Sequence, residues 1–187
     1  MILSQFQSVG RDLFTRGLVS SSSGNLSIRL GDRIVITRRG SNLGCLEEND
    51  LIETGLSKND RNTPLASVEL PVHRTIYQET PALAIVHAHS PHAVALSLTE
   101  TEITPSDTDG VSLANRLPVV GWHMEVKPGG LADIIAQALK QCRIVMVHGH
   151  GSFAIGQLLE ESHNYTTTLE ESCRVICLLK SLKVTPS

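Results

Sequence analysis

The stretch LAIVHAHSPHAVALS, residues 83–97, combines small apolar side chains with three histidines. Side chains two positions apart on a β-strand point to the same face, so an extended chain here directs His87 and His89 to one side. The Ser90-Pro91 pair that follows favours a helix start, because serine is a good N-cap residue and proline fits the first helical turn. This stretch therefore predicts a buried strand that ends in two aligned imidazoles and leads into a helix.

The remainder of the chain alternates between segments of helical and of extended character. Apolar residues spaced three to four apart predict helices at residues 1–18, 67–79, 128–141 and about 157–182. Alternating or short continuous apolar runs predict strands at residues 26–30, 34–36, 83–89, 117–122 and 143–147. Irregular chain is predicted for residues 41–55, with a short turn of helix, and for residues 57–64 and 101–116. This pattern predicts an α/β protein in which helices pack against a central sheet.

Length and composition limit the class of protein. A chain of 187 residues is long enough for a full hydrophobic core, and we expect one domain over residues 1–187. The net charge of −3 offers no basic surface for nucleic acid. No apolar run approaches the roughly 18 residues of a membrane span, and charged residues interrupt the N-terminal segment, which argues against a signal peptide. The sequence therefore predicts a soluble, cytoplasmic protein.

The four cysteines carry no metal or disulfide signal. Cys45, Cys142, Cys173 and Cys177 include no CxxC pair, and the chain is longer than small disulfide scaffolds are. We expect all four to be small buried apolar side chains.

A catalytic zinc site needs one more ligand than the strand supplies. Such sites take three protein ligands, commonly histidines, and keep one position open. His87 and His89 supply two, and His148 or His150, which lie among glycines after a predicted strand, supplies the third. Spacing alone leaves both open, and ligand type does not exclude manganese or cobalt. The other histidines, taken singly, are expected to be hydrogen-bonded structural residues: His73, His92, His123 and His163.

Glu69 is the candidate proton carrier. It opens the helix that precedes the histidine strand, where a carboxylate near the metal could be partly desolvated and act as general acid and base. A glutamate that the helix N-terminal dipole stabilises fits the same position.

Two loops have the composition of an anion site. The turn SSSGN, residues 21–25, can present hydroxyls and backbone N–H groups to an anion, although such turns are common. Arg38 and Arg39, in ITRRGSNLG, add guanidinium groups that suit a phosphate or a carboxylate.

Four motifs in a fixed order carry a resemblance to a known family. They are GNLSIRL with VITRRG, then SVELPVHRTIY, then AIVHAHSPHAVALS, then HGSFAIGQLLEES. Together, over nearly the whole chain, they resemble the class II aldolase/adducin family. The resemblance implies a three-layer α/β/α fold with a central, mainly antiparallel sheet, and a homotetramer with its active site near a subunit boundary.

The resemblance also implies roles for particular residues. The family's zinc histidines fall on His87, His89 and His150, which favours His150 over His148. Its catalytic glutamate falls on Glu69. Its phosphate cradle falls on Ser22, Gly24, Asn25, Gly40 and Ser67.

The chain departs from the family pattern near the expected substrate. Arg38 and Arg39 replace a proline and a hydroxyl residue, so either Arg39 holds the phosphate by charge or the anionic group sits differently. Val68 replaces a serine, and Gly149 stands where asparagine commonly precedes the third zinc histidine. The acid tyrosine of some relatives has no counterpart in residues 98–121.

The implied activity is that of a zinc-dependent class II aldehyde-lyase of carbohydrate metabolism. It would reversibly cleave a small, L-fuculose-1-phosphate-like ketose phosphate to dihydroxyacetone phosphate and an aldehyde. A Lewis-acidic metal would stabilise the enediolate and Glu69 would move its proton. Decarboxylation of a 3-oxo-acid phosphate uses the same enediolate, and epimerisation or dehydration of a sugar phosphate are further alternatives.

Two other classes of protein are disfavoured by particular residues. A non-catalytic, adducin-like assembly protein would lack the zinc ligands, whereas this chain has all three histidines and Glu69. A cupin-type metal site needs an acidic residue shortly after its H-x-H motif, and none follows His89 until Glu100.

Overall fold

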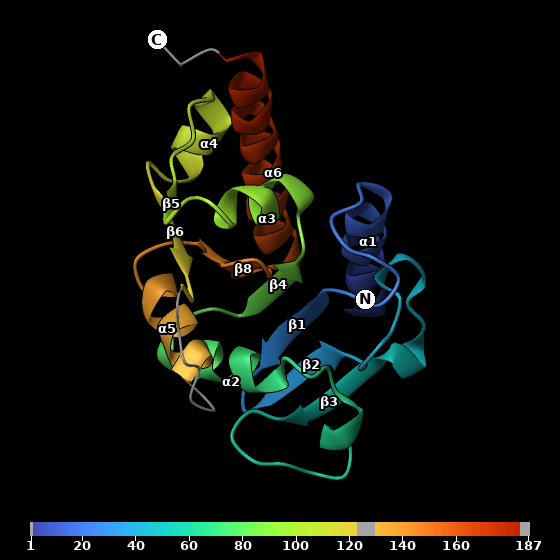
Figure 1. Ribbon diagram of the computed structural model, residues 1–187. Coiled ribbons are helices and arrows are strands. Elements are labelled where there is room, and N and C mark those ends of the chain that lie inside the picture. The colour runs from blue at the N-terminus through green and yellow to red at the C-terminus, as the bar shows by residue number, and fades with distance from the viewer. Residues whose placement is uncertain (1, 123–129, 184–187) are drawn as a thin grey trace.

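The computed structural model describes residues 2–122 and 130–183 (Figure 1). One mixed sheet of eight strands forms the centre of this part of the chain, in the order β3-β2-β1-β4-β8-β7-β6-β5. Only β6 and β7 pair in parallel among these strands, so the sheet is mainly antiparallel as expected. The strands are β1 (Asn25–Leu30), β2 (Arg33–Thr37), β3 (Leu51–Gly55), β4 (Ala84–Ala88), β5 (Glu102–Ile103), β6 (Leu117–Val120), β7 (Ile144–Val147) and β8 (Gly151–Gly156).

Helices cover both faces of this sheet. They are α1 (Ile2–Thr15), α2 (Leu70–Glu79), α3 (Pro91–Ser97), α4 (Thr108–Leu113), α5 (Gly130–Leu139) and α6 (Leu159–Leu182), with short 3-10 turns at Leu43–Cys45, Glu48–Asp50 and Thr63–Leu65. On one face, a buried cluster joins Tyr77 of α2 and Ile135 of α5 to Phe153 of β8. On the other face, α1, α3 and α6 enclose two clusters that include Phe6 and Leu169 (Figure 1). The expected α/β fold with helices on a central sheet is confirmed.

The predicted helices and strands mostly form, and the misses have tertiary causes. Residues 51–55, predicted to be irregular, form strand β3, because they pair along the whole of β2. Residues 101–116, also predicted to be irregular, contain β5 and α4, and the Asp107 side chain caps α4 by accepting from Gly110 N at 3.0 Å. Strand β8, which begins at Gly151, was not predicted; it pairs with both β4 and β7.

Two smaller expectations also need correction. Only Cys173 of the four cysteines is buried, and Cys45 is exposed on a surface turn. The helix predicted from residue 67 begins at Leu70. The backbone N–H of Glu69 donates to the hydroxyl of Ser67, ahead of this helix start. His123 lies outside the described residues.

Among residues 2–122 and 130–183, no helix has both the length and the apolarity to cross a membrane.

The buried His73 makes the stability of this fold sensitive to acid. Burial lowers the pKa of His73 from 6.5 to about 3. The unfolded chain binds a proton near pH 6.5 while the folded protein keeps His73 neutral, so stability is full above that pH and is lost as the pH falls towards 3. Over this pH range we expect the free energy of unfolding to fall by about 1.4 kcal/mol per pH unit, the effect of one bound proton. Urea unfolding at several pH values should show this slope reduced in His73→Leu; equal slopes would contradict it.

Candidate metal centre

His87 lies near the end of β4 with one ring nitrogen fixed by the sheet. It is 1% exposed, and its Nδ1 lies 2.9 Å from the carbonyl oxygen of Ser152 on the neighbouring β8. A carbonyl only accepts, so Nδ1 carries the hydrogen and Nε2 keeps its lone pair. The ring of Phe153 stacks on His87 at 4.1 Å between centroids and 18° between planes. In metal sites, a hydrogen-bond acceptor on the ring nitrogen that does not bind the metal orients the histidine, and the carbonyl of Ser152 is such an acceptor for His87.

His89 lies beside His87 because the strand alternates, as the sequence predicted. Its backbone N–H donates to the carbonyl of Leu18 at 2.9 Å, which holds the end of β4 against the chain that leaves α1. The Nε2 atoms of His89 and His87 are 3.0 Å apart. Two ring nitrogens thus face one point.

His150 completes the cluster from the turn between β7 and β8. The candidate ligand atoms of His87, His89 and His150 lie within 4.8 Å of one another. Donors bound to one zinc ion at about 2.1 Å lie no more than about 4.2 Å apart, so a small rotation of one ring closes the set. The side chain of His150 is 36% exposed, which leaves it room for that rotation. His148 lies outside the cluster and packs on Trp122, at 4.1 Å between ring centroids.

The protonation of the cluster suits a cation. Burial, and then the neighbouring imidazoles His89 and His150, lower the pKa of His87 well below its ordinary value. Burial and His150 lower the pKa of His89 to about 4. Both rings are therefore neutral near pH 7, which is the form that binds a metal. The three histidines together could hold a divalent ion.

Glu69 reaches the cluster from the other side of the site. It occupies the N-cap position of α2, yet its side chain makes no cap hydrogen bond. Its Oε1 lies 3.6 Å from Nε2 of His150. Burial raises the pKa of Glu69, against an opposing effect of the charge on His150. The carboxylate is thus turned to the histidines rather than to the backbone of its own helix.

One hollow of about 240 Å³ gathers every site residue predicted from the sequence. It is lined by Ser22, Ser23, Gly24, Asn25, Arg38, Arg39, Gly40, Ser67, Val68, Glu69, His87, His89 and His150. Ser23 also lines the hollow, although it was not predicted as a site residue; it lies within the serine run, and its hydroxyl accepts from Ser20 N at 2.7 Å. Residues from five separate stretches of the chain therefore converge on one space.

The loop of Gly24 and Asn25 can lie against the histidine strand because residue 24 has no side chain. Gly24 has a φ of 77°, and a Cβ there would lie 2.9 Å from the carbonyl oxygen of His87. Asn25 pairs in register with His87, is 4% exposed, and its Oδ1 has no hydrogen-bond partner in the described structure. A buried polar atom without a partner is costly, so this amide suits a polar ligand in the hollow.

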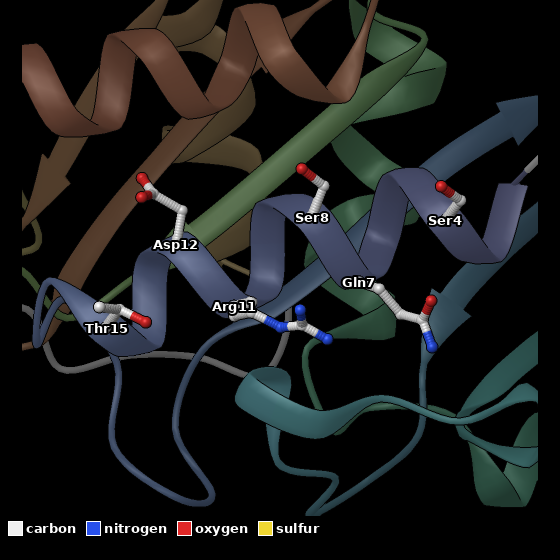
Figure 2. Close-up of a pocket in the computed structure, with 6 residues that line it drawn as sticks. All are labelled: Ser4, Gln7, Ser8, Arg11, Asp12 and Thr15. Carbon is white, nitrogen blue, oxygen red and sulfur yellow. The ribbon is translucent and has the colours of Figure 1, made fainter.

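A larger hollow, of about 490 Å³, lies on the polar face of α1. Figure 2 shows its lining side chains, all from this helix: Ser4, Gln7, Ser8, Arg11, Asp12 and Thr15. The carboxylate of Asp12 is already paired, at 2.7 Å with Arg16 and at 2.8 Å with His163. An active site needs reactive groups that converge from several elements, and this face of one helix does not provide them.

The helix after His89 is capped by a residue that the sequence did not indicate. The hydroxyl of Ser90, the predicted cap, makes no cap hydrogen bond. The carboxylate of Glu170 on α6 instead accepts the backbone N–H groups of His92 and Ala93, at 3.1 Å each, and contacts His92 Nδ1 at 2.7 Å. A cap from 78 positions away in sequence leaves no local signal. His92, like His163 and His73, is therefore a hydrogen-bonded structural residue, as predicted.

The fold and the triad define an α/β protein with a site that could hold a divalent metal. The family model described as "Class II Aldolase and Adducin N-terminal domain" matches residues 4–177. The chain belongs to the class II aldolase and adducin family.

Relatives within the family differ in activity. This chain is similar to the crystal structure of L-fuculose-1-phosphate aldolase from Thermus thermophilus, with a TM-score of 0.90 and 34% sequence identity; the match covers 99% of this chain and 97% of that one. The 3-oxo-tetronate 4-phosphate decarboxylase of Pectobacterium atrosepticum is 30% identical over 94% of this chain and 84% of its own length. The methylthioribulose-1-phosphate dehydratase of Gluconobacter oxydans is 32% identical over 82% of this chain and 80% of its own length.

Proposed function

We propose that this protein is a zinc-dependent aldolase that reversibly cleaves a small ketose phosphate into dihydroxyacetone phosphate and an aldehyde. His87, His89 and His150 would hold the metal, and Glu69 would be the general acid and base. The observation that carries the proposal is the distance of 3.6 Å between Glu69 Oε1 and His150 Nε2 in a hollow that the other two histidines also line. We place the protein in the cytoplasm as a homotetramer with this hollow near a subunit boundary.

The protein's own groups have separate tasks in this reaction. When bound, a divalent cation supplies Lewis acidity to the oxygens of a hydroxy-ketone. Glu69, with its pKa raised by burial, holds the proton that the carbon atom gains when its bond to the aldehyde breaks, and takes that proton back in the reverse direction. The unpartnered Oδ1 of Asn25 can accept a hydrogen bond from a substrate hydroxyl. Ser22, Gly24, Gly40 and Ser67 would surround the phosphate, with the charge of Arg39 replacing the hydroxyl that relatives have there.

Decarboxylation of a 3-oxo-acid phosphate is the second candidate, and the two arginines favour it. Arg38 and Arg39 both line the hollow, and neither forms an ion pair with a carboxylate of the described chain. A 3-oxo-acid phosphate brings a carboxylate as well as a phosphate, so it offers a partner for each guanidinium. Carbon dioxide then leaves in place of the aldehyde, and Glu69 protonates the same carbon.

A screen of purified, metal-analysed protein separates these candidates. Ketose 1-phosphates, 3-oxo-acid 4-phosphates and dehydratable sugar phosphates would each be supplied with zinc, manganese or cobalt. Release of an aldehyde together with dihydroxyacetone phosphate supports aldol cleavage, and release of carbon dioxide supports the second candidate. Loss of water or epimerisation without cleavage would contradict both.

Exchanging Glu69 for glutamine tests its role directly. Glu69→Gln keeps the size of the side chain and all three histidines, so metal content should stay at the wild-type value. Exchange of the carbon-bound proton of dihydroxyacetone phosphate with deuterated water, followed by NMR, should slow by about 10²–10⁴-fold. Glu79→Gln, at the far end of the same helix, is the matched control and should exchange normally. Wild-type exchange in Glu69→Gln would rule out the proposed role.

A further inference from the structure

A buried hydrogen-bonded trio joins α2 to the sheet on the face that carries the histidines. The hydroxyl of Ser27, on β1, lies 2.7 Å from His73 Nδ1 and 2.7 Å from the hydroxyl of Tyr77. Ser27 and His73 are fully buried, and Tyr77 is 1% exposed. Buried polar groups are costly when they lose their partners, so these three contacts strongly favour one relative position of helix and strand.

The spacing of the trio relates it to Glu69. Glu69, His73 and Tyr77 follow one another at intervals of four residues. Side chains four apart lie on the same side of a helix, about 6 Å from one another along its axis. The backbone N–H of His73 also donates to the carbonyl of Glu69 at 3.1 Å, so Glu69 is joined to the first turn of α2. Hydrogen bonds that fix His73 and Tyr77 therefore also constrain the backbone of Glu69, the residue that caps this helix.

A second contact relates the trio to the metal cluster. The ring of His73 meets Phe153 edge-on, with 6.0 Å between centroids, and Phe153 stacks on His87. Phe153 and His87 are also partners in the register of β8 and β4. His73 Nε2 has no hydrogen-bond partner in the described chain, so the hydrogen bond to Ser27 is what orients its ring.

We propose that Ser27, His73 and Tyr77 are positioning residues for Glu69. Their hydrogen bonds set the rotation and the axial position of α2, and so hold the carboxylate of Glu69 beside His150. Ser27 is the hub because its hydroxyl contacts both partners. The catalytic consequence rests on the proposed role of Glu69 in proton transfer, whereas the geometric consequence does not.

The test is the Ser27→Ala protein, loaded with metal, by crystallography and by kinetics. Removing the hydroxyl leaves His73 Nδ1 and the Tyr77 hydroxyl unpaired, so α2 should shift and the separation of 3.6 Å between Glu69 and His150 should lengthen. A displacement of about 1 Å is enough to lower kcat by roughly 10–100-fold. Metal affinity and KM should stay unchanged, because the three histidines belong to β4 and the turn before β8. Tyr77→Phe, which removes one hydrogen bond, should show a smaller effect in the same direction and serves if Ser27→Ala does not fold.

Two comparisons separate positioning from plain stability. Ser162, on α6, has another fully buried hydroxyl, which donates to the carbonyl of Ala84 at 3.2 Å. The Ser162→Ala variant should lower Tm and leave kcat intact. In a Glu69→Gln background, Ser27→Ala should lower the rate no further, because the group that it positions is already gone.

Three results would overturn the positioning role. They are an unchanged distance from Glu69 to His150 in both trio variants, a loss of Tm with no loss of kcat, and rate losses that multiply in the double variant. A Glu69→Gln protein with wild-type exchange is a different failure, since it overturns the proposed function of Glu69 while the crystal structures still decide whether the trio positions it.

Discussion

Alanine at His150 is expected to abolish stoichiometric binding of a divalent metal, whereas alanine at His148 is expected to leave it intact. The two histidines are separated by a single glycine, yet only His150 joins the cluster of His87 and His89. Losing an outer-shell partner costs about 10–100-fold in metal affinity, and losing a ligand should cost more than that. Catalysis should disappear with the metal.

The measurement is metal content after dialysis, with Kd from competition against a chromophoric chelator. His150 is 36% exposed, so its removal should leave Tm of the metal-free protein almost unchanged. His148→Ala is the matched control, because its ring packs on Trp122 and not on the cluster. Equal metal content in His150→Ala and wild type would refute the proposed ligand set.

Alanine at Gly151 is expected to disrupt the same metal site although all three proposed histidine ligands stay unchanged. A Cβ at this position would lie 2.4 Å from the carbonyl oxygen of Ala88, 2.9 Å from Cδ2 of His89 and 3.1 Å from Cε1 of His87. The oxygen belongs to the backbone of β4, so the strands must separate locally and carry the two histidines with them. Overpacking of this kind costs about 1–3 kcal/mol of unfolding free energy.

We expect Gly151→Ala to lose metal affinity by more than about 100-fold, the upper range of the effect of outer-shell changes. Gly130→Ala is the control, because a Cβ there meets nothing within 4 Å at the start of α5. It should bind metal normally and keep or slightly raise Tm. Wild-type metal affinity in Gly151→Ala, with a lowered Tm, would mean that the close approach serves stability alone.

The histidine strand and its helix could be predicted because their signals are local. Alternation directs His87 and His89 to one face whatever lies beside the strand, and apolar spacing marks α1 and α6 in the same way. The edge strand β3 was missed although the buried Ile52 and Thr54 alternate with less buried neighbours, because the acidic residues before it favour a loop. It forms because β2 offers a complete row of backbone partners.

The residues of the site were predictable to different degrees. Residue patterns suggested Glu69 and the serine loop as candidates and the family resemblance implied their roles; in the structure they line one hollow with the histidines. Residue spacing by itself did not choose between His148 and His150 as the third metal ligand. The hub at Ser27 and the helix cap from Glu170 have no sequence signal, since their partners lie 46 to 78 positions away.

What the sequence by itself determined is therefore the set of reactive groups and the direction in which each short segment presents them, since backbone geometry depends on near neighbours. Only the tertiary structure decided that β8 lies beside β4 and that α2 aims Glu69 at the histidines. Those decisions belong to strand register and to the burial of distant side chains against each other, which are properties of the whole packed chain.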